Sequence, residues 1–109
     1  ELPRWCTHAC LAPATANSLA RLAQGIADDA LSTTFLALRR GTPCVLAPAM
    51  NAEMWFNPAT VRNLAWLRAQ DRYTVVEPVE KRLACGDVGV GGLAEPSDIL
   101  AAVQAASAG

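Results

Sequence analysis

The apolar residues of the chain follow two kinds of pattern. Short continuous apolar runs bounded by Gly, Pro or polar residues are typical of strands buried on both faces of a sheet. Between them lie longer stretches in which apolar residues recur every three or four positions, the spacing of one helix face. The two patterns alternate, which predicts an α/β fold with a parallel sheet. The predicted strands are residues 9–14, 43–47 and 73–77.

Four helices are expected between and after these strands. Asn17 or Ser18 can cap the first helix, and Gly25 marks its end. Pro96 suits the first position of the last helix. The expected ranges are 17–25, 28–41, 59–69 and 96 onward.

Ligands on open parallel sheets bind in the loops that follow the carboxyl ends of the strands. Three loops are expected at that edge, namely residues 13–18, 48–57 and 80–92. The third belongs to a Gly-rich stretch, 78–96, which has little periodicity and predicts a functional loop or lid.

Composition and charge exclude several classes of protein. A chain of 109 residues with 52% hydrophobic and 17% charged side chains suits one small globular domain. A net charge of −1 without a basic stripe argues against nucleic acid as a partner. No apolar run reaches about 18 residues, so a cytoplasmic protein without a membrane span is expected. The four cysteines are expected to remain thiols there.

The first candidate motif is Pro-Ala-Thr-Ala-Asn-Ser at residues 13–18. It places small and hydroxyl residues at a strand-to-helix turn, where backbone N–H groups and side-chain donors can meet an anion or a polar ring edge. The same residues also serve as ordinary helix caps. Taken alone, the segment is compatible with either role.

The second motif is Pro-Ala-Met-Asn-Ala-Glu-Met-Trp at residues 48–55. Asn51 offers neutral donors suited to a carboxylate, and Met50, Met54 and Trp55 offer apolar walls. The alternative is a core turn whose Met and Trp side chains simply pack.

The third motif is Arg-Leu-Ala-Cys-Gly-Asp at residues 82–87. A lone Cys is usually an inert buried residue. Cys85, however, lies in a Gly-rich loop with Lys81, Arg82 and Asp87 nearby, a setting that favours access and reactivity.

In this order, the three motifs resemble those of the homo-oligomeric flavin-containing cysteine decarboxylases. The PASANT-type motif of that family is PATANS here, its PxMNxxMW motif is PAMNAEMW, and its ACGD motif is residues 84–87. The resemblance continues through GIADDALSTT and AEPSDI. The ACGD element favours the phosphopantothenoylcysteine branch over the peptidyl-cysteine decarboxylases, which share only the first two motifs.

The resemblance implies a three-layer, flavodoxin-like (Rossmann-like) parallel sheet whose first strands are missing, with residues 1–109 as the C-terminal part of the flavoprotein domain. It implies FMN as cofactor and decarboxylation of 4′-phosphopantothenoylcysteine to 4′-phosphopantetheine in coenzyme A biosynthesis. It also implies a homotrimer or a higher multiple, with FMN at the subunit interfaces.

The family's functional residues carry over by position. The resemblance implies FMN contacts from Thr15, Ala16, Asn17, Ser18 and Ala49. It implies that Asn51, Arg82 and Ala84 bind substrate and that Cys85 donates a proton. The family's catalytic His belongs to a His-Ile-Glu-Leu segment whose last two residues match Glu1 and Leu2. That His is expected two positions before Glu1, so the chain alone is expected to be inactive, and His8 does not replace it.

Two other functions stay open. One is decarboxylation of a peptide C-terminal cysteine, and the other is a non-catalytic, phosphatase-regulating subunit of the same family. Cys85 argues against the regulator, because such a subunit has no chemical need of that thiol.

Two further signals are set aside. Cys6, His8 and Cys10 alternate and could share a strand face, but they lack a fourth ligand and standard zinc spacing, so packing under a helix is expected. Residues 89–94 match the dinucleotide pattern GxGxxA, but Pro96 interrupts the strand-turn-helix unit that this fingerprint requires.

Overall fold

The computed structural model describes the backbone of residues 8–82 and 88–108, and the side chains discussed below belong to residues 8–80 and 92–106. Three parallel strands form the central sheet, in the order β1-β2-β3. They are β1 (Ala9–Ala14), β2 (Cys44–Pro48) and β3 (Tyr73–Val75). The three predicted strands are thus confirmed to within two residues at each end.

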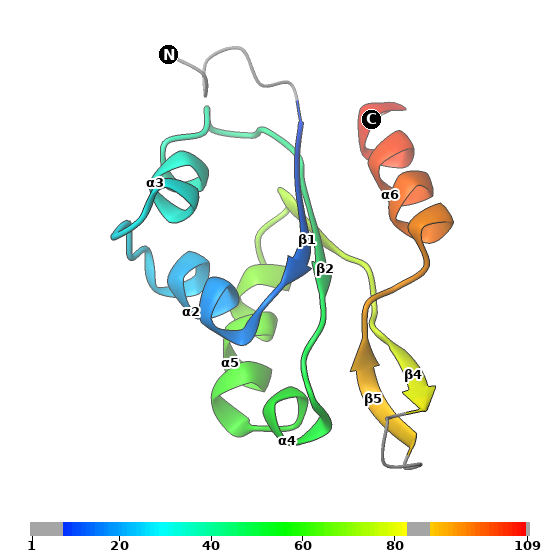
Figure 1. The fold of residues 1–109 in the computed structure, drawn as a ribbon. Helices are drawn as coiled ribbons and strands as arrows, with labels where there is room; N and C mark the ends of the chain where they lie inside the picture. The colour runs from blue at the N-terminus through cyan, green and yellow to red at the C-terminus, as the bar shows by residue number, and fades with distance from the viewer. Residues whose placement is uncertain (1–7, 83–87, 109) are drawn as a thin grey trace.

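The helices complete a three-layer α/β arrangement, which confirms the expected fold class (Figure 1). Helices α2 (Ala16–Gln24) and α3 (Ala30–Leu36) connect β1 to β2. Helices α4 (Ala52–Trp55) and α5 (Pro58–Arg68) connect β2 to β3. Figure 1 shows α2, α3 and α5 on one face of the sheet, and α6 (Pro96–Ala108) on the other, where it contacts β2.

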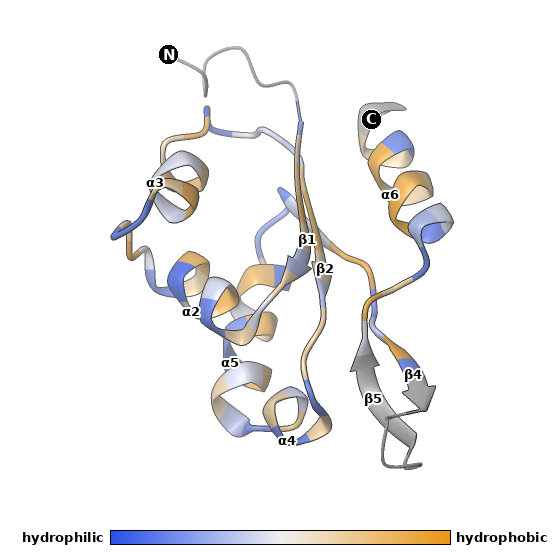
Figure 2. Ribbon diagram, in the orientation of Figure 1, coloured by the Kyte–Doolittle hydropathy of each residue, from blue (hydrophilic) through white to orange (hydrophobic). Residues whose placement is uncertain are grey.

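The core lies between the sheet and the α2–α5 layer. One cluster of fully or nearly fully buried residues joins β1 and β2 to these two helices, and a smaller one lies beneath α3. The first consists of Ala14, Leu19, Leu46, Leu64 and Leu67, and the second of Phe35, Leu38 and Cys44. Helix α6 is apolar along most of its length, whereas α2 alternates between polar and apolar residues (Figure 2). The alternation in α2 is the amphipathic pattern of a helix that covers one face of a sheet.

The Gly-rich stretch is not the irregular loop that was expected. Strands β4 (Val79–Arg82) and β5 (Val88–Gly92) pair as an antiparallel hairpin. Strands of four and five residues are too short to show a clear period, and the glycines of β5 remove side chains that would mark the alternation. Because residues 88–92 form this strand, they are not the phosphate-binding turn of a dinucleotide fold.

Three local predictions are wrong. Thr15, not Asn17 or Ser18, caps α2. The backbone of Thr15 is still extended after the end of β1, and the helix begins at the next residue, Ala16. Helix α3 ends at Leu36, short of Gly41, which instead adopts a positive φ of 86° in the following turn. In α5, Val61 is exposed, although the apolar pattern placed it on the buried face.

A candidate flavin and substrate site

The carboxyl ends of β1 and β2 bring the first two motifs together. The backbone N–H of Ala49, just after β2, donates to the carbonyl oxygen of Ala14 at the end of β1, at 3.1 Å. Since neighbouring parallel strands end at the same edge of a sheet, the loops that follow them start side by side. The two loops that carry the residues expected around the cofactor therefore start side by side, joined by this hydrogen bond.

In the first motif, two hydroxyl groups hold the start of α2. The Thr15 Oγ1 atom accepts a hydrogen bond from the Ser18 backbone N–H at 3.1 Å, and the Thr15 hydroxyl also lies 3.1 Å from the Ser18 Oγ atom. The backbone N–H groups of Ala16 and Asn17 have no acceptor among the described residues. Thr15 and Ser18 thus form the cap, while the first turn of α2 still offers free donors.

In the second motif, Asn51 caps the short helix α4. The Asn51 side-chain oxygen accepts from the Met54 backbone N–H at 2.9 Å. A backbone N–H can only donate, so the atom that faces it must be Oδ1, and this fixes the orientation of the amide. The Nδ2 group then faces away from the helix, and the side chain is exposed. It has no acceptor in the part of the chain that the structure describes.

A cleft of about 340 Å³ opens between the starts of α2 and α5 and the end of α4. Its lining includes Ala16 and Asn17 from the first motif and Met54 from the second, together with Ala20, Asn57, Ala59, Thr60 and Asn63. None of these side chains carries a charge. Thr15, Ser18 and Asn51 do not line the cleft, although each is adjacent in sequence or bonded to a residue that does. Ala49 does not line the cleft either, and its backbone N–H donates to Ala14 instead.

Sequence reasoning missed the wall that α5 contributes. Thr60, Asn63, Leu64 and Leu67 are buried and fall at i, i+3, i+4 and i+7, so they share one helix face. Two polar residues on an otherwise apolar buried face were the signal that could have identified this wall. Met50 and Trp55, in contrast, pack against the core. Of the three residues expected as apolar walls, only Met54 lines this cleft.

Of the third motif, the structure describes only the backbone of Arg82, which lies in the hairpin. Strand β5 contacts α4, so the hairpin lies beside the helix that Asn51 caps (Figure 1). Arg82 is the last residue of β4. Its side chain, Ala84 and Cys85 lie outside the described residues.

Among the described residues, the groups with shifted pKa values lie away from this cleft. Burial raises the pKa of Cys44 and of Tyr73, which are the first residues of β2 and β3, at the opposite edge of the sheet. Hydrogen bonds from Ser32 lower the pKa of Asp29 at the start of α3. The described walls of the cleft are thus built for neutral polar contacts rather than for proton transfer.

No grouping of three His, Cys, Asp or Glu side chains that could hold a metal ion occurs within residues 8–82 and 88–108. Cys10 is exposed, so it does not pack under a helix as expected. Among the same residues, no helix is both long and apolar enough to cross a membrane.

Comparison with known proteins gives consistent matches. The family model described as Flavoprotein matches residues 1–107. A phosphopantothenoylcysteine decarboxylase of Arabidopsis thaliana is 43% identical over 104 residues, which cover 95% of this chain and 49% of the relative. The chain therefore spans about half the length of that relative.

Two solved structures show how closely the backbone of this chain matches those of known proteins. A PPC decarboxylase mutant complexed with pantothenoylaminoethenethiol matches with a TM-score of 0.91 and 40% identity, over 99% of this chain and 59% of the other. The FMN-dependent cysteine decarboxylase SpaF matches with a TM-score of 0.68 and 43% identity, over 90% and 51%. At similar identity, the backbone is closer to that of the first protein.

Proposed function

The chain belongs to the Flavoprotein family, and on this premise we propose that it is part of an FMN-dependent phosphopantothenoylcysteine decarboxylase. In this proposal it supplies one wall of the flavin site and the group that binds the substrate carboxylate. Activity belongs to a polypeptide in which these residues are joined to the rest of the family domain, since the chain spans about half of its relative.

The residues that line the 340 Å³ cleft suit FMN. A flavin ring is flat and largely apolar with polar atoms along one edge, and the cleft combines Met54 and small side chains with the amides of Asn17 and Asn57. The free N–H groups of Ala16 and Asn17 can meet acceptor atoms of the cofactor. When bound, FMN supplies a two-electron acceptor and donor, which allows loss of CO₂ from a carboxylate that has no electron sink of its own.

The fixed amide of Asn51 is the observation that carries the proposal. Because Oδ1 is held by the Met54 N–H at 2.9 Å, the two Nδ2 protons are presented outward as donors. They can bind the carboxylate of the cysteine moiety without rotating the side chain, and a neutral donor does not hold the carboxylate so firmly that CO₂ is prevented from leaving. The α4 cap thus orients the reacting end of the substrate.

The hairpin is proposed to complete the site. The family resemblance assigns substrate contacts to Arg82 and Ala84 and proton donation to the Cys85 thiol. Contact between β5 and α4 supports this assignment, because it brings the hairpin beside Asn51. A thiol has an ordinary pKa of about 8.5, so at neutral pH it carries the proton that the enethiolate product requires.

A peptide with a C-terminal cysteine is the second candidate substrate. A solved structure of EpiD with a substrate peptide that ends in cysteine, DSYTC, matches this chain at 25% identity, and the same Asn51 amide could bind the carboxylate of such a peptide. The PPC decarboxylase matches more closely, with a TM-score of 0.91 and 40% identity against 0.78 and 25%, and this supports the phosphopantothenoyl compound over the peptide.

The test is a substrate assay on the chain within a complete family domain, loaded with FMN. CO₂ release is measured with phosphopantothenoylcysteine and with a peptide ending in cysteine. Faster turnover of the first compound supports the proposal. Turnover of the peptide alone would assign the second substrate, and no CO₂ from either would refute a decarboxylase.

A further inference from the structure

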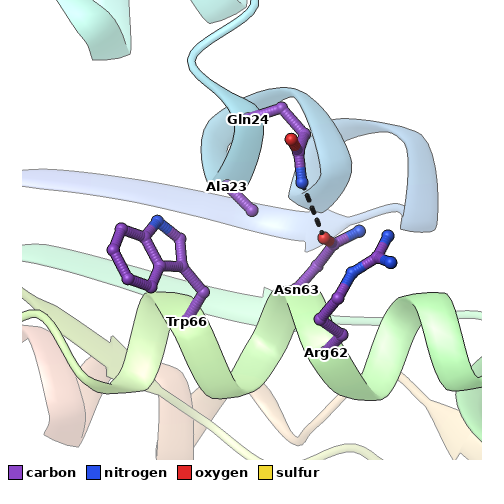
Figure 3. A pocket seen from close by; sticks show the side chains of 5 residues that line it. All are labelled: Ala23, Gln24, Arg62, Asn63 and Trp66. Atoms are coloured by element: carbon purple, nitrogen blue, oxygen red, sulfur yellow. Dashed lines mark hydrogen bonds between the residues drawn. The ribbon is translucent and has the colours of Figure 1, made fainter.

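A second cleft lies on the outer face of the helical layer. It measures about 360 Å³ and opens between the last turn of α2 and the middle of α5 (Figure 3). Ala23 and Gln24 line it from α2, and Arg62, Asn63 and Trp66 line it from α5. It shares only Asn63 with the cleft proposed for the flavin.

The Asn63 side-chain amide borders this space. Its side chain is only 6% exposed, and its Oδ1 atom accepts from Gln24 Nε2 at 3.3 Å. Figure 3 shows the Asn63 nitrogen directed toward the side of the cleft where Arg62 lies. The Nδ2 group has no acceptor among the described residues. Because no buried side-chain N or O atom among the described residues lacks a hydrogen-bond partner, this Nδ2 group is reached by solvent, and it can donate to an acceptor in the cleft.

Arg62 adds an unpaired positive charge beside that donor. Within the described residues it takes part in no ion pair or hydrogen bond. Arg68 on the same helix differs, because it pairs with Glu77. The guanidinium of Arg62 can therefore bind an anion with two parallel hydrogen bonds.

The other wall of the cleft is flat and apolar. The Trp66 indole is 59% exposed and faces the cleft together with the Ala23 methyl group (Figure 3). An exposed indole beside a small side chain leaves room for a ring to stack on it.

We infer that this α2–α5 cleft is a second ligand site, which binds a small anion joined to a flat ring. Arg62 and the Asn63 Nδ2 group bind the anion, and the Trp66 indole stacks on the ring. The side-chain Oε1 atom of Gln24 accepts a hydrogen bond from an N–H or hydroxyl group at the edge of the ring. A nucleoside monophosphate and an aromatic carboxylate both have this chemistry, and the volume suits a ligand of that size.

Isothermal titration of the 109-residue chain tests the site with four probes: AMP, adenosine, inorganic phosphate and benzoate. AMP should bind at least about tenfold more tightly than phosphate or adenosine, because it alone joins both groups. Benzoate binding as tightly as AMP would instead identify an aromatic carboxylate as the ligand, with the site upheld. Arg62→Gln should weaken AMP binding by about tenfold or more, as expected for a charged hydrogen bond. The matched control is Arg68→Gln, which removes the same charge from the same helix outside the cleft and should leave AMP binding unchanged.

A second variant tests the stacking surface of the α2–α5 cleft. Trp66→Leu should weaken AMP binding but not phosphate binding, since it removes only the stacking surface, and thermal melting verifies that the variant is folded. Equal effects of Arg62→Gln and Arg68→Gln, or no binding of any probe at about 10 mM, would overturn the inference. So would displacement of AMP by saturating FMN, because it would place AMP in the first cleft.

Discussion

Strand β2 and the loop that follows it are held in place by different forces. All five residues of β2 are buried, and each side chain is fixed by its neighbours in the core. In the next nine residues Met50 and Trp55 still pack against the core, but side-chain caps also hold the chain, from Asn51 onto Met54 and from Asn57 onto Ala59. Burial leaves no atom free to meet a ligand, whereas a cap uses one end of an amide and leaves the other end available.

This difference separates stability from function along one short stretch of chain. A change in β2 should cost folding free energy, while a change in the loop that keeps the cap should cost binding or turnover alone. The predictions below test that separation, beginning with the largest effect.

Leu46→Ala should destabilise the fold by about 2 to 5 kcal/mol, since Leu46 is fully buried at the centre of the sheet and truncation leaves a cavity. Urea unfolding followed by circular dichroism measures the loss. Leu36→Ala is the control, because Leu36 is 57% exposed and the same truncation should cost less than about 1 kcal/mol. Equal losses would show that the sheet centre is not the principal core.

Asn51→Asp, within a complete family domain, should reduce decarboxylation about a hundredfold while the fold persists. Aspartate caps a helix as well as asparagine, so the bond to the Met54 N–H survives. The new charge, however, repels the substrate carboxylate and removes both N–H donors. CO₂ release and FMN affinity are measured together, and FMN affinity should change by only a few-fold.

Asn51→Ser is the matched variant for that experiment. Serine also caps a helix and lacks the N–H donors, but it adds no charge, so its loss of turnover should be smaller than that of Asn51→Asp. Near-normal CO₂ release from the Asp variant would remove Asn51 from its proposed role.

Thr15→Ala should cost about 1 kcal/mol of stability, the usual effect of losing an N-cap. The lost bond is the one from the Ser18 N–H to the Thr15 hydroxyl oxygen. Thr15→Ser keeps this oxygen and should stay close to the parent in urea unfolding. If the alanine variant also matched the parent, Thr15 would not be the cap that sets the start of α2.

The sequence predicted the sheet well because burial leaves a strong pattern. Apolar runs identified β1 and β2, a short strand was expected at β3, and Pro96 is the first residue of α6 as predicted. Burial repeats over many residues, so a single atypical position such as Val61 does not hide it.

The site was harder to predict, because it depends on single hydrogen bonds. Asn17, Ser18 and Thr15 are all good capping residues, and only the backbone dihedrals at the end of β1 select Thr15. Helix α4 has four residues, which is too short for a helical period to be detected. The third wall, with Thr60 and Asn63, was missed because polar residues on a helix are usually assigned to solvent.

Asp29 gives the smallest and most specific prediction, since its carboxylate caps α3. Its pKa is lowered from the ordinary value of 3.8, first by the hydrogen bond from the Ser32 hydroxyl, then by that from the Ser32 N–H, and last by the charge of Arg21. A lowered pKa in the folded state means that folding favours the ionised form. The resulting stabilisation is present above the unfolded pKa near 3.8 and is lost as the pH falls through the lower folded value.

Asp29→Asn tests this sign directly. In the parent, the Ser32 backbone N–H donates to the Asp29 Oδ1 atom at 2.7 Å. Asparagine keeps an oxygen that can accept this hydrogen bond, but it cannot ionise. The parent should therefore be more stable than the variant at pH 6, and the difference should shrink steadily between about pH 5 and pH 2 in urea unfolding. Because hydrogen bonds outweigh Arg21 among the causes, 0.5 M NaCl should leave most of this pH dependence intact. A difference that stays constant with pH would show that the cap does not depend on the ionised carboxylate, and one that disappears in salt would assign the effect to Arg21.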